Sequence, residues 1–167
     1  MPEKEKIYST KMKYDGVFDF SEFYKFCYFW LIDETQLNLE ESKYTEKIIG
    51  EGKNLDIEWN GYRKITDFFR MEIKVNFKII GLKKTEVVRD GIKIKMNEGS
   101  VEMKVAGTLV RDYAGKFETS AGNKFLRAIY EKWIIPGRIE HFEEYIIGKC
   151  DEYTTQAKAW LDLEGKQ

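Results

Sequence analysis

The stretch from residue 71 to residue 79 alternates strictly between apolar and polar side chains. The odd positions are apolar: Met71, Ile73, Val75, Phe77 and Ile79. The even positions carry charged or amide groups: Glu72, Lys74, Asn76 and Lys78. Because successive residues of a β-strand point to opposite faces, this pattern predicts a strand with one buried and one solvated face. Such strands form antiparallel sheets whose buried face is covered by helices, so we expect an α+β fold.

Turn signals after this strand predict a four-stranded meander. Asp90-Gly91 is typical of a two-residue type I′ turn, which sets Arg89 opposite Ile92. Further turns are expected at residues 81–83 and 98–99. These registers place four charges of alternating sign in one row on the solvated face: Lys78, Glu86, Lys95 and Glu102. Opposite charges on neighbouring strands stabilise a sheet, so the row supports the register.

More strands and one helix are expected before the meander. Strands are predicted over residues 6–14, 43–50 and 54–60, and Asn60-Gly61 is typical of a hairpin turn. Asp19 and Glu22 form a capping box, which predicts a helix that ends near residue 33.

The predicted first helix is unusually aromatic. Eight of the thirteen residues from Phe18 to Trp30 are aromatic. A helix that is apolar on more than one face needs a second contact surface. That surface would be the C-terminal helices, a ligand, a partner chain or a membrane interface. We favour the C-terminal helices, because a domain of this size offers few other apolar elements.

Two apolar stripes with helical spacing follow residue 117. The first consists of Phe125, Leu126, Ile129, Tyr130 and Trp133. The second consists of Ile139, Phe142, Ile146, Cys150, Tyr153, Ala157 and Trp160. Pro136-Gly137 separates them, since proline interrupts a helix. No repeat or linker divides the chain, so residues 1–167 are expected to form a single α+β domain.

The resulting element order resembles the helix-grip superfamily (START and Bet v 1-like proteins). The resemblance implies a curved antiparallel sheet of about seven strands (β-α-β6-α-α) with C-terminal helices packed on it. It also implies an apolar cavity between sheet and C-terminal helix, which relatives use for hydrophobic ligands. The chain departs from the superfamily in its break at Pro136-Gly137 and in having one helix, where two are usual, in the first connection.

Three polar residues interrupt the predicted inner face of the meander: Thr85, Arg89 and Arg111. An arginine on such a face reaches the rim, pairs with a carboxylate or meets an anionic ligand. If the cavity exists, the two arginines would hold the acidic head of an amphipathic ligand. The remaining predicted ligand-binding residues are apolar: Val75, Phe77, Ile92, Met103 and Val105. The competing interpretation is a structural ion pair over a filled core.

The sequence lacks the signatures of most enzymes. It has one His and two Cys, and no phosphate-binding loop, zinc motif or nucleophile elbow. We therefore expect no cofactor and no metal site, and nothing in the sequence supports catalysis. His141 lies between Glu140 and Phe142, which favours a solvated or salt-bridged side chain over a catalytic one.

The composition and the lengths of the apolar runs predict where in the cell the protein is located. The longest apolar run, Phe26 to Ile32, is far too short to span a membrane, and the N-terminus lacks an apolar segment typical of secretion. Cys27 and Cys150 are expected to be buried thiols, so we predict a cytoplasmic protein. The charged fraction of 34%, with few Cys and His, is also typical of thermophiles.

The sequence is compatible with three functions. The first is a non-enzymatic protein that binds a hydrophobic or amphipathic small molecule between sheet and C-terminal helix. The second is a module for protein interaction or self-association through helix Phe18–Trp30 or helix Ile139–Trp160. The third is an RNA- or ribosome-associated factor, since residues 62–116 carry thirteen basic and seven acidic side chains. Lys74, Lys93 and Lys104 would form its basic face, although a merely solvated sheet face is favoured over RNA binding.

Overall fold

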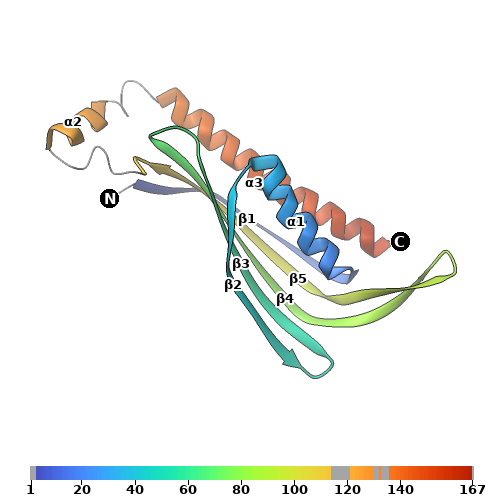
Figure 1. The fold of residues 1–167 in the computed structure, drawn as a ribbon. Helices are drawn as coiled ribbons and strands as arrows, with labels where there is room; N and C mark the ends of the chain where they lie inside the picture. Colours follow the sequence, from blue (N-terminus) through green and yellow to red (C-terminus); the bar gives the residue numbers. More distant parts are fainter. Residues whose placement is uncertain (1–2, 114–120, 130–131, 133–135, 167) are drawn as a thin grey trace.

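The computed structural model describes residues 3–113, 121–129, 132 and 136–166, which form an α+β fold (Figure 1). Its elements are β1 (Glu3–Phe18), α1 (Phe20–Thr35), β2 (Asn38–Ile49), β3 (Gly52–Lys64), β4 (Phe69–Arg89), β5 (Ile92–Arg111), α2 (Ala121–Ile129) and α3 (Pro136–Lys166). The strands form one antiparallel sheet in the order β1-β5-β4-β3-β2. The predicted class is confirmed, but the sheet has five strands and not seven.

The strand count differs because the predicted meander is a single long hairpin. The turn at Asp90-Gly91 forms, and Arg89 lies opposite Ile92 as predicted. The turns expected at 81–83 and 98–99 do not form. These two segments lie opposite each other instead, at a register shift between Ile80 and Lys83.

Glycines explain why these segments resemble turns. Gly81 has a φ of +68°, which suits the extra residue of a β-bulge as well as it suits a turn. At Gly99 an added Cβ would lie 3.2 Å from both Ile80 O and Leu82 Cα. Gly81 therefore supplies the positive φ of the bulge, and Gly99 permits the close approach of the two backbones, so the hairpin bends there and the chain does not reverse.

The predicted charge row is half right. Lys78 lies opposite Glu102, and Glu86 lies opposite Lys95. The two pairs belong to different parts of the β4–β5 hairpin, on either side of the bulge, so they do not form one row across four strands. The prediction that Phe77 faces the core and Lys78 the solvent is confirmed.

Asn60-Gly61 lies inside β3 and does not form the predicted turn. Gly61 is opposite Leu39 on β2 and Ile73 on β4. An added Cβ at Gly61 would lie 3.0 Å from Leu37 Cδ1 and 3.2 Å from Leu39 Cδ1. Glycine is required here because the two leucines occupy the space that a side chain would take. It is not required for a reversal of the chain.

The first helix begins where the capping box predicts. The Asp19 side chain accepts a hydrogen bond from the backbone N–H of Glu22 at 3.2 Å. Phe26 stacks on Trp160 of α3 with ring centroids 5.9 Å apart, so α1 finds its expected contact with the C-terminal helix. Phe29 is 54% exposed. Tyr130 and Trp133 of the first predicted C-terminal stripe lie outside the described residues, and Phe125, Leu126 and Ile129 are exposed.

Helices α1 and α3 both pack on one face of the sheet, here called the inner face (Figure 1). From α3, the buried residues are Ile146, Cys150, Tyr153, Thr154, Ala157 and Leu161. The Tyr153 hydroxyl donates a hydrogen bond to the Cys27 carbonyl at 3.1 Å, which ties α3 to α1. Burial raises the pKa of both the Tyr153 phenol and the Cys27 thiol, so both groups stay neutral in this core.

Helix α3 comes closest to the sheet at Gly107 of β5. An added Cβ there would overlap Ile146 Cγ2 and would lie 2.9 Å from Cys150 Sγ. The absence of a side chain at Gly107 therefore lets α3 lie directly on the sheet, which closes the inner face along β1 and β5.

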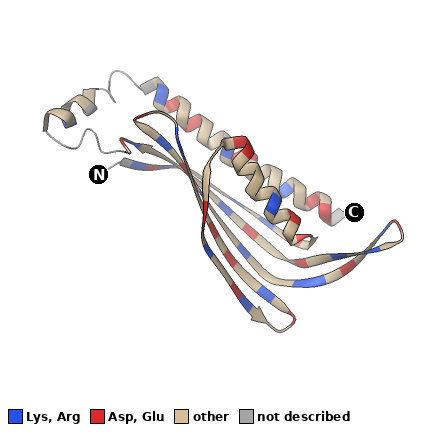
Figure 2. Cartoon of the chain, viewed as in Figure 1, with Lys and Arg blue, Asp and Glu red and all other residues tan. Residues whose placement is uncertain are grey.

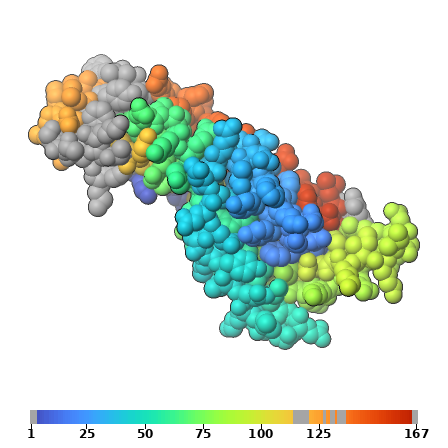
Figure 3. Space-filling view, viewed as in Figure 1, coloured from blue at the N-terminus to red at the C-terminus, as the bar shows by residue number. Residues whose placement is uncertain are grey.

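The ends of both hairpins project beyond the helix layer (Figure 3). Apolar side chains are exposed at these ends: Ile48, Ile49, Val88 and Ile92. The helices therefore cover the middle of the sheet and leave the tips of β2–β3 and β4–β5 open.

The close contact at Gly107 leads to a test of stability. Gly107→Ala should lower the free energy of unfolding by about 1–3 kcal/mol, because the new methyl group overpacks the α3 contact. Gly148→Ala makes the same chemical change on the exposed side of α3, where no atom lies within 4 Å of the new methyl. It should raise stability by roughly 0.5–1 kcal/mol, because alanine favours a helix. Urea unfolding measures both, and equal effects of the two variants would show that α3 does not rest on Gly107.

Candidate functional site

The apolar residues predicted to line a cavity lie together in the core. Val75, Phe77, Met103 and Val105 are each at most 3% exposed. The Phe77 ring meets Phe23 of α1 and Trp59 of β3 edge-to-face, with centroids 6.0 and 4.9 Å apart. Phe23 of helix α1 thus packs on Phe77, where the sequence predicts a ligand.

The other predicted site residues lie apart from this group. Ile92 is 65% exposed at the tip of the β4–β5 hairpin, and Thr85 lies half-buried on the same arm. Arg89 donates to the carbonyl of Glu164 at 2.6 Å, and its Nη1 lies 3.7 Å from the Glu164 carboxylate. It therefore holds the C-terminal end of α3 against the hairpin arm.

Arg111 is the last residue of β5, at the end of the β4–β5 hairpin away from its tip. Its Nη2 donates to Glu5 Oε2 on β1 at 2.9 Å. Both arginines therefore make structural ion pairs at the rim, as in the competing interpretation from the sequence. Because Arg89 lies at the tip of the β4–β5 hairpin and Arg111 at its other end, they do not converge on one ligand head group.

The contact of Arg89 predicts a local effect of substitution. Arg89→Met should speed amide hydrogen exchange in the last turn of α3 several-fold, because a cation there stabilises the helix end by about 0.3–1 kcal/mol. Lys93→Met, an exposed change on the same arm, should leave that exchange unaltered. Unchanged exchange in Arg89→Met would mean that the arm does not hold the helix.

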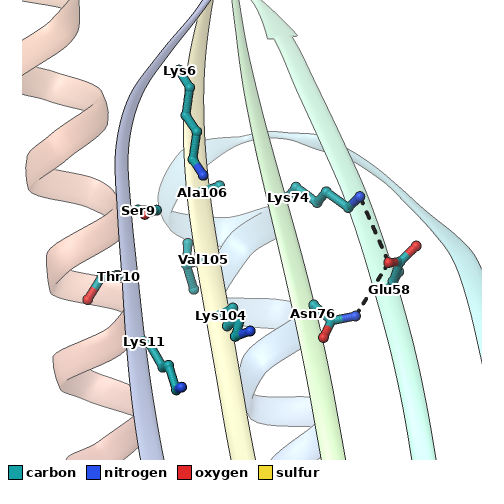
Figure 4. A pocket seen from close by; sticks show the side chains of 10 residues that line it. All are labelled: Lys6, Ser9, Thr10, Lys11, Glu58, Lys74, Asn76, Lys104, Val105 and Ala106. Carbon is teal, nitrogen blue, oxygen red and sulfur yellow. Dashed lines mark hydrogen bonds and ion pairs between the residues drawn. The ribbon is translucent and has the colours of Figure 1, made fainter.

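The outer face of the sheet, opposite to α1 and α3, carries the polar side chains of the strands. Lys and Arg alternate with Asp and Glu along these strands (Figure 2). A depression of about 510 Å³ lies across β1, β5, β4 and β3 (Figure 4). Its lining residues are Lys6, Ser9, Thr10, Lys11, Glu58, Lys74, Asn76, Lys104, Val105 and Ala106. We call it the lysine trough.

Sheet register assembles the trough from residues far apart in the sequence. Lys11 on β1 lies opposite Lys104 on β5, which in turn lies opposite Asn76 on β4. In the next row, Ala106 lies between Ser9 and Lys74. The small side chains of Ser9 and Ala106 leave the floor of the trough low, and longer lysines surround it (Figure 4).

Positive charge exceeds negative charge in the trough. Its four lysines face one lining carboxylate, Glu58, which is 3.8 Å from Lys74. Lys11 and Lys104 reach Glu102 beside the trough at 3.4 and 3.6 Å. Lys6 makes no ion pair with the described residues. The side chains of Lys11, Lys74 and Lys104 are about half exposed, so their ammonium groups remain accessible to a ligand.

The ionisation of Glu102 reflects these lysines. Partial desolvation acts to raise the pKa of Glu102, but the hydrogen bond from Lys11 and the charges of Lys11, Lys104 and Lys13 outweigh it. The net result is a pKa below the usual range for a glutamate. Several cations thus share one carboxylate, and an added anion would meet a net positive surface.

A second depression of about 390 Å³ adjoins the trough and shares Lys74 with it. It leads to Tyr62 on β3, whose ring lies 5.5 Å from the guanidinium carbon of Arg70. The same guanidinium lies 5.9 Å from the ring of Tyr113. Tyr62 is 44% exposed, so an aromatic surface and a cation lie beside the lysines.

Sequence reasoning found part of this site. Lys74 and Lys104 are correctly placed on the outer face, whereas Lys93 lies on the hairpin arm opposite Val88. Lys6 and Lys11 were missed because β1 pairs with β5, nearly a hundred residues away in the chain. Tyr62 was missed because the preceding Asn60-Gly61 resembles a turn, although the alternation through 58–64 continues the strand.

Among the described residues, no three His, Cys, Asp or Glu side chains are grouped so that they could hold a metal ion. None of the described helices combines the length and apolarity that crossing a membrane requires.

Comparisons of the chain with protein-family models, with curated protein sequences and with solved structures find no match.

Proposed function

We propose that this protein binds single-stranded RNA on the outer face of its sheet, without catalysing a reaction. The observation that carries the proposal is the lysine trough, where Lys6, Lys11, Lys74 and Lys104 surround a low floor on an exposed sheet. Lysine side chains that neutralise phosphates supply most of the affinity of sequence-independent nucleic-acid binding.

The neighbouring aromatic groups favour a single strand over a duplex. Unstacked bases can lie on tyrosine rings, and Tyr62 offers one in the depression that adjoins the trough, where Arg70 lies beside the ring and pairs with Glu72 at 3.2 Å. In a duplex the bases are stacked on one another and have no exposed face for these groups. An extended strand that follows the lysines would bring one or more bases to Tyr62.

The structure offers less support for the other two functions. A hydrophobic ligand between sheet and α3 would have to displace Phe23 from Phe77, where the rings are already in contact. A partner bound through α1 would find Phe26 already stacked on Trp160. Helix-grip relationship, hydrophobic-ligand binding and self-association stay predictions from the sequence.

Substituting the lysines tests the trough. Lys6→Gln, Lys74→Gln and Lys104→Gln should each weaken binding of a mixed-sequence single-stranded RNA and lower its salt dependence. Each phosphate contact on a single strand contributes about −0.7 to the slope of log K against log salt, so the parent with four lysines should show about −2.8. Lys93 is exposed on β5, the strand of Lys104, but lies outside the trough, so Lys93→Gln should bind as the parent does. Fluorescence anisotropy at several salt concentrations gives both numbers, and affinity that is independent of salt would refute the proposal.

The aromatic end of the site has its own test. Tyr62→Ala should weaken RNA binding by about 1–3 kcal/mol, roughly 5- to 150-fold, if one base stacks on the ring. Tyr62→Phe retains the ring and should bind like the parent. If Tyr62→Ala and Tyr62→Phe both bind RNA as tightly as the parent, no base lies on Tyr62, and the contact is with phosphate alone.

A further inference from the structure

Glu41 on β2 lies on the inner face, opposite to the lysine trough. In the sheet register it is opposite Trp59 of β3, which is fully buried. One carboxylate oxygen, Oε1, accepts two hydrogen bonds, from the Tyr24 hydroxyl at 2.7 Å and from Trp59 Nε1 at 3.1 Å. Helix α1 and strand β3 thus fix the orientation of an otherwise exposed carboxylate.

Aromatic rings surround this carboxylate. The rings of Tyr24 and Tyr28 are stacked within 5° of parallel, and each meets Trp59 edge-to-face, with centroids 5.1 and 5.5 Å apart. Tyr44, further along β2, is 45% exposed, and its pKa is raised by burial first, then by the charge of Glu46 and lastly by that of Glu41. Glu41 and Tyr44 are both exposed, so the carboxylate and this phenol ring border an open surface.

The negative charge of Glu41 has no counterion within the described chain. Both of its hydrogen-bond donors are neutral, and burial with the Glu41 hydrogen bond raises the pKa of Tyr24 to about 12. The lysines that lie near in sequence or register are engaged elsewhere. Lys25 pairs with Glu22, Lys43 with Asp56 and Lys53 with Glu46.

We propose that Glu41, together with Tyr24, Tyr28 and Tyr44, binds an alkylammonium or guanidinium group. An oriented carboxylate forms a charge-assisted hydrogen bond with such a cation. The electron-rich faces of phenol rings also attract its positive charge. The cation would come from a lysine or arginine side chain of a partner segment or from a free amine. This site lies on the other face from the RNA site, so each proposal stands or fails independently of the other.

A purely structural role for Glu41 makes a different prediction. If Glu41 served only to accept hydrogen bonds from Trp59 and Tyr24, glutamine would serve as well, since its amide oxygen is also an acceptor. Glu41→Gln therefore keeps the acceptor and removes the charge that a cation requires. Asp33→Asn removes a charge from an exposed position on α1 away from the site and is the matched control.

The indole N–H of Trp59 is a direct reporter, because it donates to Glu41 itself. In ¹H–¹⁵N spectra of the full chain, its resonance should shift and saturate on titration with n-butylammonium chloride or acetyl-Ala-Lys-Ala-amide. Neutral 1-pentanol and acetyl-Ala-Glu-Ala-amide should leave it in place, which tests the charge requirement without any variant. Glu41→Gln should lose at least tenfold in affinity, and Asp33→Asn should lose none.

The two ligands distinguish the sources of the cation. Tighter binding of the peptide supports a partner side chain, and equal binding supports a free amine; both outcomes support the site. The proposal is overturned if the indole resonance of the parent does not respond to either cation, if 1-pentanol produces the same shift, or if Glu41→Gln binds as tightly as the parent.

Discussion

The contact of α3 with Gly107 determines how this fold is closed. Because β5 has no side chain there, Ile146 and Cys150 reach the sheet backbone, and the helix lies flat across β1 and β5. Tyr153 then reaches the carbonyl of Cys27, so that the position of α3 also fixes α1. A larger residue at one position of one strand would lift both helices, since protein interiors have no spare volume for a displaced side chain.

Close packing on the inner face makes the two faces of the sheet chemically different. The inner face is filled by aromatic and aliphatic groups, with Phe77 enclosed between Phe23 and Trp59. The outer face bears ammonium groups. Along β4 and β5 the residues on this face alternate with core residues, so that exposed Lys74 precedes buried Val75 and exposed Lys104 precedes buried Val105. One alternating pattern therefore produces both the core and the proposed RNA site, while the open margin at β2 leaves Glu41 accessible.

Local patterns predicted local structure well, and they failed where glycine has more than one use. The alternation around Phe77 and the cap at Asp19 depend on neighbouring residues alone, and both predictions are confirmed. Gly61 and Gly99 were taken for turn residues, but they make room for Leu37 and Leu82, which only the folded structure brings near. Splitting one hairpin into two gave seven strands in place of five, and the same kind of error hid Tyr62. The trough was only half visible because the pairing of β1 with β5 cannot be derived from adjacent residues.

Our proposal requires that RNA approach the uncovered sheet face and not the helix layer. Photo-cross-linking of the full chain to a 4-thiouridine-containing single-stranded RNA, with the modified residues identified by mass spectrometry, tests this most directly. The account predicts adducts in the strands that carry Lys6, Lys11, Lys74 and Lys104. Adducts concentrated on α3, around Lys149 and Lys158, with none on those strands, would contradict it.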